Sequence, residues 1–247
     1  MEKFETYNRS FINGEWVEGE SSTVFQDVNP YDESIITTIR LATKEQTQEA
    51  FEIASKAQKE WATSTAAERK EVIQKVINYY KENHDDIVQM IVKETGGTML
   101  KANVEISLTL EVLEEALNYA DELDNVREVP SSIDGKVNKI YRLPLGVVSS
   151  ISPFNFPTNL SMRSIIPAIA LGSAVVHKPD IQVGIVGGVI IAKAFEYAGL
   201  PKGVFNMILT DIPEIGDEML TNPNAKLISF TGSTAVGKHI GEIAGRN

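Results

Sequence analysis

The feature that most constrains the fold is a regular alternation of strand-like and helical segments across residues 145–247. Four short apolar segments of the kind that form buried strands cover residues 146–151, 174–176, 204–209 and 227–230. Each is followed, after a short connection, by a segment with helical spacing: 159–171, 182–198, 213–220 and the residues from Ser233 onward. Strands and helices that alternate in this way specify a parallel sheet with helices on both faces. The sequence therefore predicts an α/β fold with a doubly wound parallel sheet.

The residues before this region predict a hairpin, a strand and several helices. An Asn13-Gly14 turn between residues 11–12 and 15–17 is a strong local signal for a β-hairpin. Thr43 and Gln46 fit a capping box at the start of the first helix. The other predicted segments are a strand at 35–39, a helix from Thr65 or Ala66 to Gly96-Gly97 with a turn before His84, and a helix over 98–124.

Residues 126–144 differ from both neighbouring regions. Two extended segments, 126–129 and 137–141, flank a Pro-Ser-Ser-Ile-Asp-Gly stretch and are more typical of a projecting hairpin arm than of a core. We therefore divide the chain into N-terminal strands and helices that pack on the α/β domain (1–125), an extended arm (126–144) and the α/β domain itself (145–247).

The composition excludes several classes of site. The chain has no cysteine, so disulfides, thiolate metal sites and thiol nucleophiles are excluded within these residues. Its three histidines, His84, His177 and His239, are too scattered to indicate a metal site. We expect each of them at the surface or at a strand end, and we predict no metal.

The charge argues against a nucleic-acid partner. The net charge is −11, and residues 1–144 hold 16 Lys+Arg against 27 Asp+Glu, whereas residues 145–247 hold 7 of each. The neutral second part can still accept one anionic cofactor through local helix dipoles. The most apolar stretch, Val183–Ala192, is too short to cross a bilayer, and the N-terminus lacks the apolar core of a signal peptide. We therefore expect a cytoplasmic protein without membrane association.

A possible phosphate site follows the fourth predicted strand. In such sheets ligands bind beyond the carboxyl ends of the strands. Gly232 permits close approach of the backbone there, and Ser233 places hydroxyl and amide groups at the positive end of a helix, which suits a phosphate. Simple N-capping by Ser233 is the alternative, and no Gly-x-Gly-x-x-Gly follows the first strand.

Two further candidates follow the first and second predicted strands. Lys178 could donate hydrogen bonds to ribose hydroxyls or a phosphate, or it could be a surface lysine whose ammonium reaches solvent. Asn155 lies in a stiff loop between Pro153 and Pro157. Its side-chain amide could stabilise an oxyanion, a contribution of about 3 kcal/mol in other systems, or it could be an Asx-turn residue.

The joint order of these motifs resembles the aldehyde dehydrogenase superfamily. The motifs are Pro-Phe-Asn-Phe-Pro at 153–157, Lys-Pro-Asp at 178–180 and Phe-Thr-Gly-Ser-Thr-Ala-Val-Gly at 230–237. The resemblance extends over the whole chain, and the Lys-Pro-Asp motif with Gly187-Gly188 is most similar to the benzaldehyde dehydrogenase branch. It implies a Rossmann-like cofactor domain and only the N-terminal portion of the family's fold, without the catalytic domain.

The resemblance also implies a role for each candidate. In the family a cysteine attacks the aldehyde to give a thiohemiacetal, hydride passes to NAD or NADP, and a glutamate activates the water that hydrolyses the thioester. Asn155 would stabilise the oxyanion, Lys178 would hold the adenosine ribose, and Ser233 in its Gly232-led turn would lie at the pyrophosphate. The other residues expected to contact the cofactor are Ser152, Pro153, Phe154, Asp180 and Val236.

Three departures from the family pattern qualify this expectation. Phe154 replaces the usual tryptophan, a change that should preserve packing. Ile181 replaces the glutamate of many NAD-preferring members, and without that carboxylate a 2′-phosphate is not repelled, so NAD and NADP both remain possible. The family's general-base glutamate and nucleophilic cysteine follow the residue that matches Asn247. We therefore expect this chain to be inactive alone and its sheet to have an exposed edge.

Three hypotheses remain open at this point. The chain could be part of an aldehyde-oxidising enzyme, or a non-catalytic NAD(P)-binding or interaction protein on the same scaffold. A third possibility is a structural partner that joins intact homologues through residues 126–143. The family further implies a small-molecule aldehyde substrate, which the sequence does not identify, and a homo-oligomer assembled partly through the arm.

Overall fold

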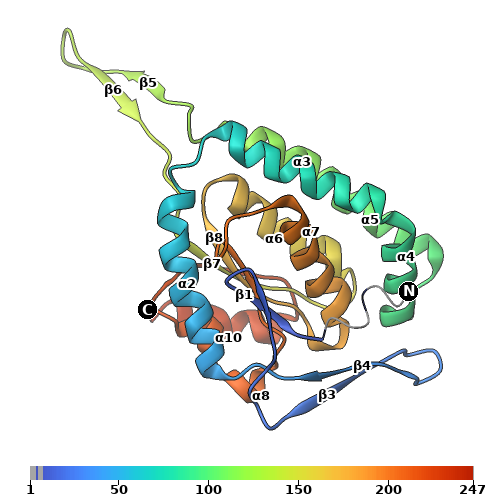
Figure 1. Ribbon diagram of the computed structural model, residues 1–247. Coiled ribbons are helices and arrows are strands. Elements are labelled where there is room, and N and C mark those ends of the chain that lie inside the picture. Colours follow the sequence, from blue (N-terminus) through green and yellow to red (C-terminus); the bar gives the residue numbers. More distant parts are fainter. Residues whose placement is uncertain (1–3, 5–7, 247) are drawn as a thin grey trace.

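The computed structural model describes Phe4 and residues 8–246, which are arranged around one six-stranded sheet (Figure 1). The strands lie in the order β10-β7-β8-β9-β1-β2. In chain order they are β1 (Ser10–Ile12), β2 (Glu15–Val17), β7 (Val147–Ile151), β8 (Ala174–Lys178), β9 (Phe205–Met207) and β10 (Ala225–Phe230). β10, β7, β8 and β9 are parallel, which confirms the predicted sheet, although β9 is shorter than expected.

The predicted N-terminal hairpin is present and extends this sheet. Asn13 and Gly14 both have positive φ, 53° and 73°, as the tight turn between β1 and β2 requires. β1 also pairs antiparallel with β9, through Phe11 and Met207, so the sheet is mixed. The sequence did not predict this pairing, because it joins segments almost two hundred residues apart.

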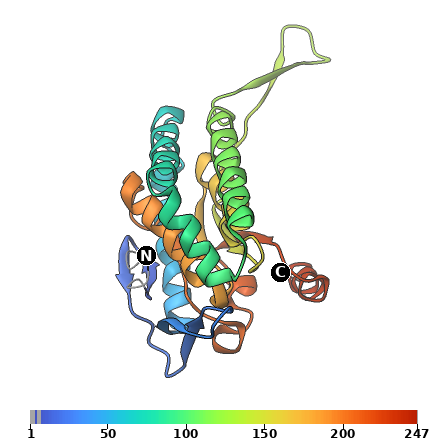
Figure 2. The same cartoon turned by 90° about the vertical axis from the view of Figure 1, so that its right-hand side faces the viewer.

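Two separate hairpins lie outside the sheet. One is formed by β3 (Val24–Val28), which the sequence analysis missed, and β4 (Ile35–Arg40), which it predicted. The other is the predicted arm, β5 (Arg127–Pro130) paired with β6 (Val137–Ile140), which projects from the body in both views (Figures 1 and 2).

Helices cover both faces of the sheet, which makes it doubly wound. On one face lie α6 (Pro157–Ala170) and α7 (Ile190–Ala198), themselves covered by α3 (Ala66–Glu82), α4 (His84–Thr95) and α5 (Met99–Tyr119). The helices associated with the other face are α2 (Lys44–Trp61), α8 (Ile212–Ile215), α9 (Glu218–Thr221) and α10 (Thr234–Ala244). Buried residues of 1–125 and of 145–247 form one continuous core, so the two regions pack as one unit.

The predicted helix 182–198 is wrong in its first half. The chain forms a 3₁₀ turn, η1 (Ile181–Val183), and a π-helical turn, η2 (Ile185–Val189), before α7 begins. The buried Glu94 carboxylate accepts hydrogen bonds from the amides of Ile185 and Val186, both at 2.7 Å. A π-turn widens the helix and changes which backbone groups are paired within it. Periodicity along the sequence cannot reveal a turn that a distant side chain stabilises.

Three other helix boundaries differ from the predictions. The segment 213–220 is two short helices, because Gly216 has a φ of 56° and ends α8. α5 ends at Tyr119 rather than at residue 124. The Arg69 guanidinium donates a hydrogen bond to the Ala120 carbonyl at this helix end, at 2.9 Å. α6 begins at Pro157, two residues earlier than predicted, because the first turn of a helix does not need the amide that proline lacks.

Within residues 4 and 8–246, no helix is long and apolar enough to cross a membrane. The same residues contain no group of three or more His, Asp or Glu placed to hold a metal ion.

Candidate functional site

The carboxyl ends of β10, β7 and β8 lie side by side and in register. Phe230 of β10 is paired with Ile151 of β7, and Ile151 is paired with Lys178 of β8. The chain runs outward from β7 through β8 to β9 and then returns to the other side of β7 as β10. The strand order therefore reverses between β7 and β10, where the ligand crevice of a doubly wound sheet opens. The candidate residues follow these three strands.

Lys178 is buried, with 7% of its surface exposed. Among the described residues, its ammonium has one hydrogen bond, a long one of 3.4 Å to the carbonyl of Pro179. Burial lowers the pKa of Lys178, and the nearby carboxylates of Asp180 and Asp211 partly counter that effect. The interpretation as a surface lysine is therefore wrong. An ammonium carries three donors, so this one retains capacity for the hydroxyl or phosphate oxygens of a ligand.

The loop after β7 is anchored at its first residue, and the tip of the loop is exposed. Ser152 is buried, and its hydroxyl accepts a hydrogen bond from Ser161 at 2.7 Å. Phe154 is 60% exposed and Asn155 is also exposed. Within the described part of the chain, the Asn155 side chain makes no hydrogen bond to a following backbone amide, so the structure gives no support to an Asx-turn. Its amide is available to a ligand.

The turn after β10 has a structural reason for its glycine. A Cβ at Gly232 would lie 2.4 Å from the ring of Phe230, so a side chain there would displace that ring. Ser233 caps α10, and its hydroxyl accepts a long hydrogen bond of 3.4 Å from the Val236 amide. Ser233 and Val236 are exposed in the first turn, so the positive end of α10 faces outward. The capping role is present, and it leaves room for an anion.

Asp180 has a local structural role. Its carboxylate accepts a hydrogen bond of 3.1 Å from the Gln182 amide and caps the 3₁₀ turn η1. Asp180 is the only acidic residue among the nine predicted at the site, and the chain itself uses its carboxylate for this cap. Ile181, the residue that replaces the family glutamate, is buried beside it with 8% exposed.

His177 is a residue whose role the sequence analysis missed. It is the next-to-last residue of β8, as expected for a strand end, but it is completely buried. Its ring nitrogens contact Ser150 of β7 and the Gly187 carbonyl of η2, both at 2.9 Å. Burial lowers the pKa of His177 to about 4. A histidine beside Val175 and Val176 in a buried strand was the available signal. His177 is thus a neutral bridge beneath the strand ends.

Comparison with known proteins identifies the same family that the order of these motifs resembles. Residues 16–247 match the model of the aldehyde dehydrogenase family. The AldY protein of Bacillus subtilis (strain 168) is 66% identical over 243 residues, which cover 98% of this chain and 50% of AldY. The benzaldehyde dehydrogenase YfmT of the same organism is 44% identical over 244 residues, covering 99% of this chain and 50% of that protein.

A solved structure gives the same result for the fold. An NAD-dependent benzaldehyde dehydrogenase from Corynebacterium glutamicum superposes with a TM-score of 0.93 at 43% identity, over 98% of this chain and 53% of that one. The chain spans about half the length of the curated relatives it matches. The predicted resemblance, including that to benzaldehyde dehydrogenases, is confirmed. With a family match over nearly all of its residues, this chain belongs to the aldehyde dehydrogenase family.

Proposed function

We propose that this chain binds NAD or NADP at the carboxyl ends of β7, β8 and β10, as part of the machinery that oxidises an aldehyde to a carboxylic acid. The observation that carries the proposal is the buried ammonium of Lys178, which makes a single long hydrogen bond to the residues that the structure describes and lies at the reversal of the strand order. A buried charge with unused donors is costly unless a ligand supplies acceptors.

Three groups would hold the dinucleotide. Lys178 would donate to the hydroxyls of the adenosine ribose, and the amides and hydroxyl at Ser233 would face the pyrophosphate. Val236 offers an exposed apolar surface in the same turn. The remaining proposed contacts come from the loop ends at Ser152, Pro153, Phe154, Asp180 and Gly232.

Asn155 would act on the substrate rather than on the cofactor. Its exposed amide could donate to the aldehyde oxygen as negative charge develops there, which stabilises the transition state. The bound nicotinamide supplies the hydride acceptor for the oxidation. The name of YfmT favours an aromatic aldehyde as the substrate class.

The nucleophile must come from outside these residues, because the chain has no cysteine. We infer that residues 1–247 bind the cofactor but do not by themselves oxidise an aldehyde. We also infer a cytoplasmic protein whose copies associate partly through the arm at 126–144. The absence of a thiol equally suits the alternative of a non-catalytic NAD(P)-binding protein, and the two differ in whether a catalytic portion accompanies this one.

Isothermal titration with NAD⁺, NADP⁺ and ADP-ribose tests the binding site. We expect micromolar affinity for the chain and an affinity about tenfold to a hundredfold lower for Lys178→Met, since hydrogen bonds to a charged donor are lost. Lys202→Met is the matched control, because Lys202 is exposed and pairs with Glu15 at the surface. Equal affinities for the Lys178→Met variant and the wild type would overturn the proposed site.

A second measurement tests the inferred inactivity. Incubation of the chain with NAD⁺ and benzaldehyde should give no increase in absorbance at the wavelength of NADH. Formation of NADH at a rate proportional to the concentration of the chain would contradict the need for an external thiol.

A further inference from the structure

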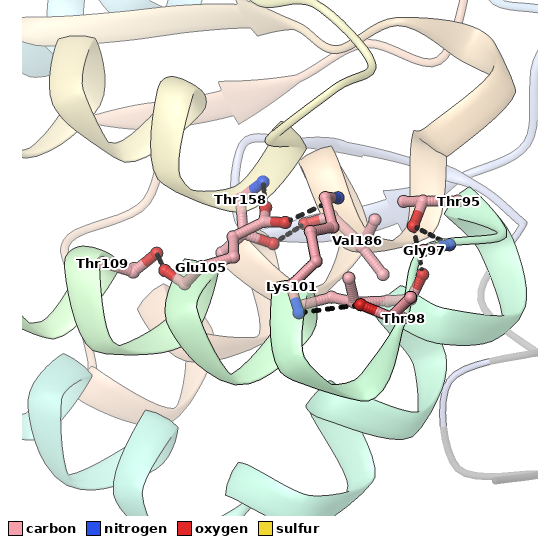
Figure 3. A network of polar contacts seen from close by, with 9 residues as sticks. Thr95, Gly97, Thr98, Lys101, Glu105, Thr109, Thr158 and Val186 are labelled. Carbon is pink, nitrogen blue, oxygen red and sulfur yellow. Dashed lines mark hydrogen bonds and ion pairs between the residues drawn. The ribbon is translucent and has the colours of Figure 1, made fainter.

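A buried carboxylate from another helix holds the start of α6, directly after the Asn155 loop. The N-cap residue Phe156 provides no side-chain hydrogen bond, and Pro157 has no amide. The first amide that needs an acceptor is therefore that of Thr158. Glu105 of α5 accepts from it at 2.8 Å, and the Glu105 side chain is completely buried (Figure 3).

Lys101, one turn earlier on α5, completes the arrangement. Its ammonium lies 3.1 Å from the second carboxylate oxygen of Glu105. The same ammonium lies 4.8 Å from the centroid of the Phe156 ring. Phe156 is the neighbour of Asn155 in the chain. One ion pair thus contacts both the residue after Asn155 and the first free amide of the following helix.

A second link joins this helix start to the region after β8. The Thr158 hydroxyl donates to the Val186 carbonyl at 2.7 Å, in the π-turn η2 (Figure 3). The amide of Val186 donates to Glu94. The loop that carries Asn155 and the segment that follows Lys178 are therefore tied together below the site, while the tip of the loop remains exposed.

We propose that Lys101 and Glu105 are positioning residues for Asn155. Glu105 fixes the start of α6, and Lys101 restrains the Phe156 ring. The exposed side-chain amide of Asn155, which lies between β7 and Phe156 in the chain, is thereby held in one position. A carboxylate at a helix N-terminus is favoured by the helix dipole, and a cation over a ring adds a directional contact. The proposal rests on the proposed function only in giving Asn155 its role at the oxyanion.

The test follows the loop by NMR in the uniformly ¹⁵N-labelled chain. In Glu105→Gln, amide exchange at Thr158 and Asn159 should be about tenfold to a hundredfold faster, since a charge-assisted hydrogen bond closes that turn. In Lys101→Met, the side-chain amide signals of Asn155 should shift or broaden. Lys101→Arg keeps the cation and should restore them.

Lys81→Met is the matched control, because Lys81 of α3 forms an exposed ion pair with Glu114 of α5 at 3.2 Å, on the surface of the same helix that carries Lys101. Asn155 signals in Lys101→Met identical to those in Lys81→Met would overturn the proposal. So would equally faster exchange throughout the sheet in Lys101→Met, which would indicate general destabilisation. If Glu105→Gln does not fold, the comparison of Lys101→Met with Lys101→Arg still decides.

A parallel titration with NAD⁺ separates this proposal from the proposed function. Lys101→Met should bind NAD⁺ within about twofold of the wild type, because the ribose contacts lie with Lys178. Absence of NAD⁺ binding in the wild type would contradict the proposed function and leave the loop measurement valid.

Discussion

His177 donates a hydrogen bond from Nε2 to the carbonyl oxygen of Gly187, 2.9 Å away. A carbonyl oxygen can only accept, so Nε2 carries the proton and Nδ1 accepts from the Ser150 hydroxyl, also at 2.9 Å. The neutral ring joins β7, β8 and η2 directly below the candidate site. This arrangement depends on the ring remaining uncharged.

Stability should consequently fall in mild acid. The pKa of His177 is lowered from 6.5 to about 4 by burial, so between these values the unfolded chain takes up a proton that the folded chain does not. The free energy of unfolding therefore begins to fall below pH 6.5, and by about pH 4 it has fallen by roughly 3 kcal/mol. Urea unfolding of His177→Gln should show a shallower loss of stability across this range, with His239→Gln as the surface control. An unchanged slope in His177→Gln would contradict the assignment.

The carboxyl group of Asp27 should have the opposite effect. Asp27 is 1% exposed, and burial raises its pKa from 3.8 to about 7. The unfolded chain loses this proton first as the pH rises, so stability is greatest below pH 4 and decreases up to about pH 7. Asp27→Asn should increase the free energy of unfolding at pH 8 by on the order of 4 kcal/mol.

Asp32→Asn is the control for this measurement. Asp32 is exposed, and hydrogen bonds from Ser34 lower its pKa, so its removal should not stabilise the chain at pH 8. The assignment fails if both variants change the free energy of unfolding equally.

The close packing of η2 against the strand ends predicts a cost for a single methyl group. A Cβ at Gly188 would lie 2.8 Å from Pro179 Cγ and 3.0 Å from Met207 Sδ. Gly188→Ala should therefore destabilise the chain by about 1–3 kcal/mol in thermal or urea unfolding. Gly241→Ala is the control, because an added Cβ there meets no described atom within 4 Å beyond the adjacent backbone of α10. It should be neutral or stabilise the chain by up to about 1 kcal/mol. Equal effects of the two substitutions would exclude this packing argument.

The outer edge of β10 predicts self-association. Among the strands of residues 8–246, β10 pairs with β7 only. Its Leu227 is 41% exposed beside a groove of about 440 Å³ that Leu143 and Leu145 also line. Unpaired strand edges promote association, and a lysine on the edge opposes it. Sedimentation velocity should show less association for Leu227→Lys than for the control Val24→Lys, which alters an exposed residue of β3. Unchanged association in Leu227→Lys would place the contact elsewhere.

Much of the local structure follows from residues close together in the chain. The capping box of Thr43 and Gln46 and the Asn13-Gly14 turn each depend on groups within three residues of one another, and both are present. The order of strands and helices after residue 145 follows from periodicity in the same way. Local propensity and patterning therefore determined the element order and the doubly wound sheet.

The tertiary structure decided which polar groups are buried and what they contact. Nothing in the sequence distinguishes Lys178 from an exposed residue at a strand end, and Glu94 and Glu105 look like ordinary charged positions of helices. For His177 the neighbouring valines indicate a buried strand, but they do not show which groups its ring contacts. Their burial depends on helices and strands that fold over them from distant parts of the chain. The π-turn at Ile185–Val189 likewise depends on Glu94, about ninety residues away. Desolvation and long-range hydrogen bonds are collective properties of the packed chain, so local pattern fixed the framework and packing alone fixed the electrostatics of the site.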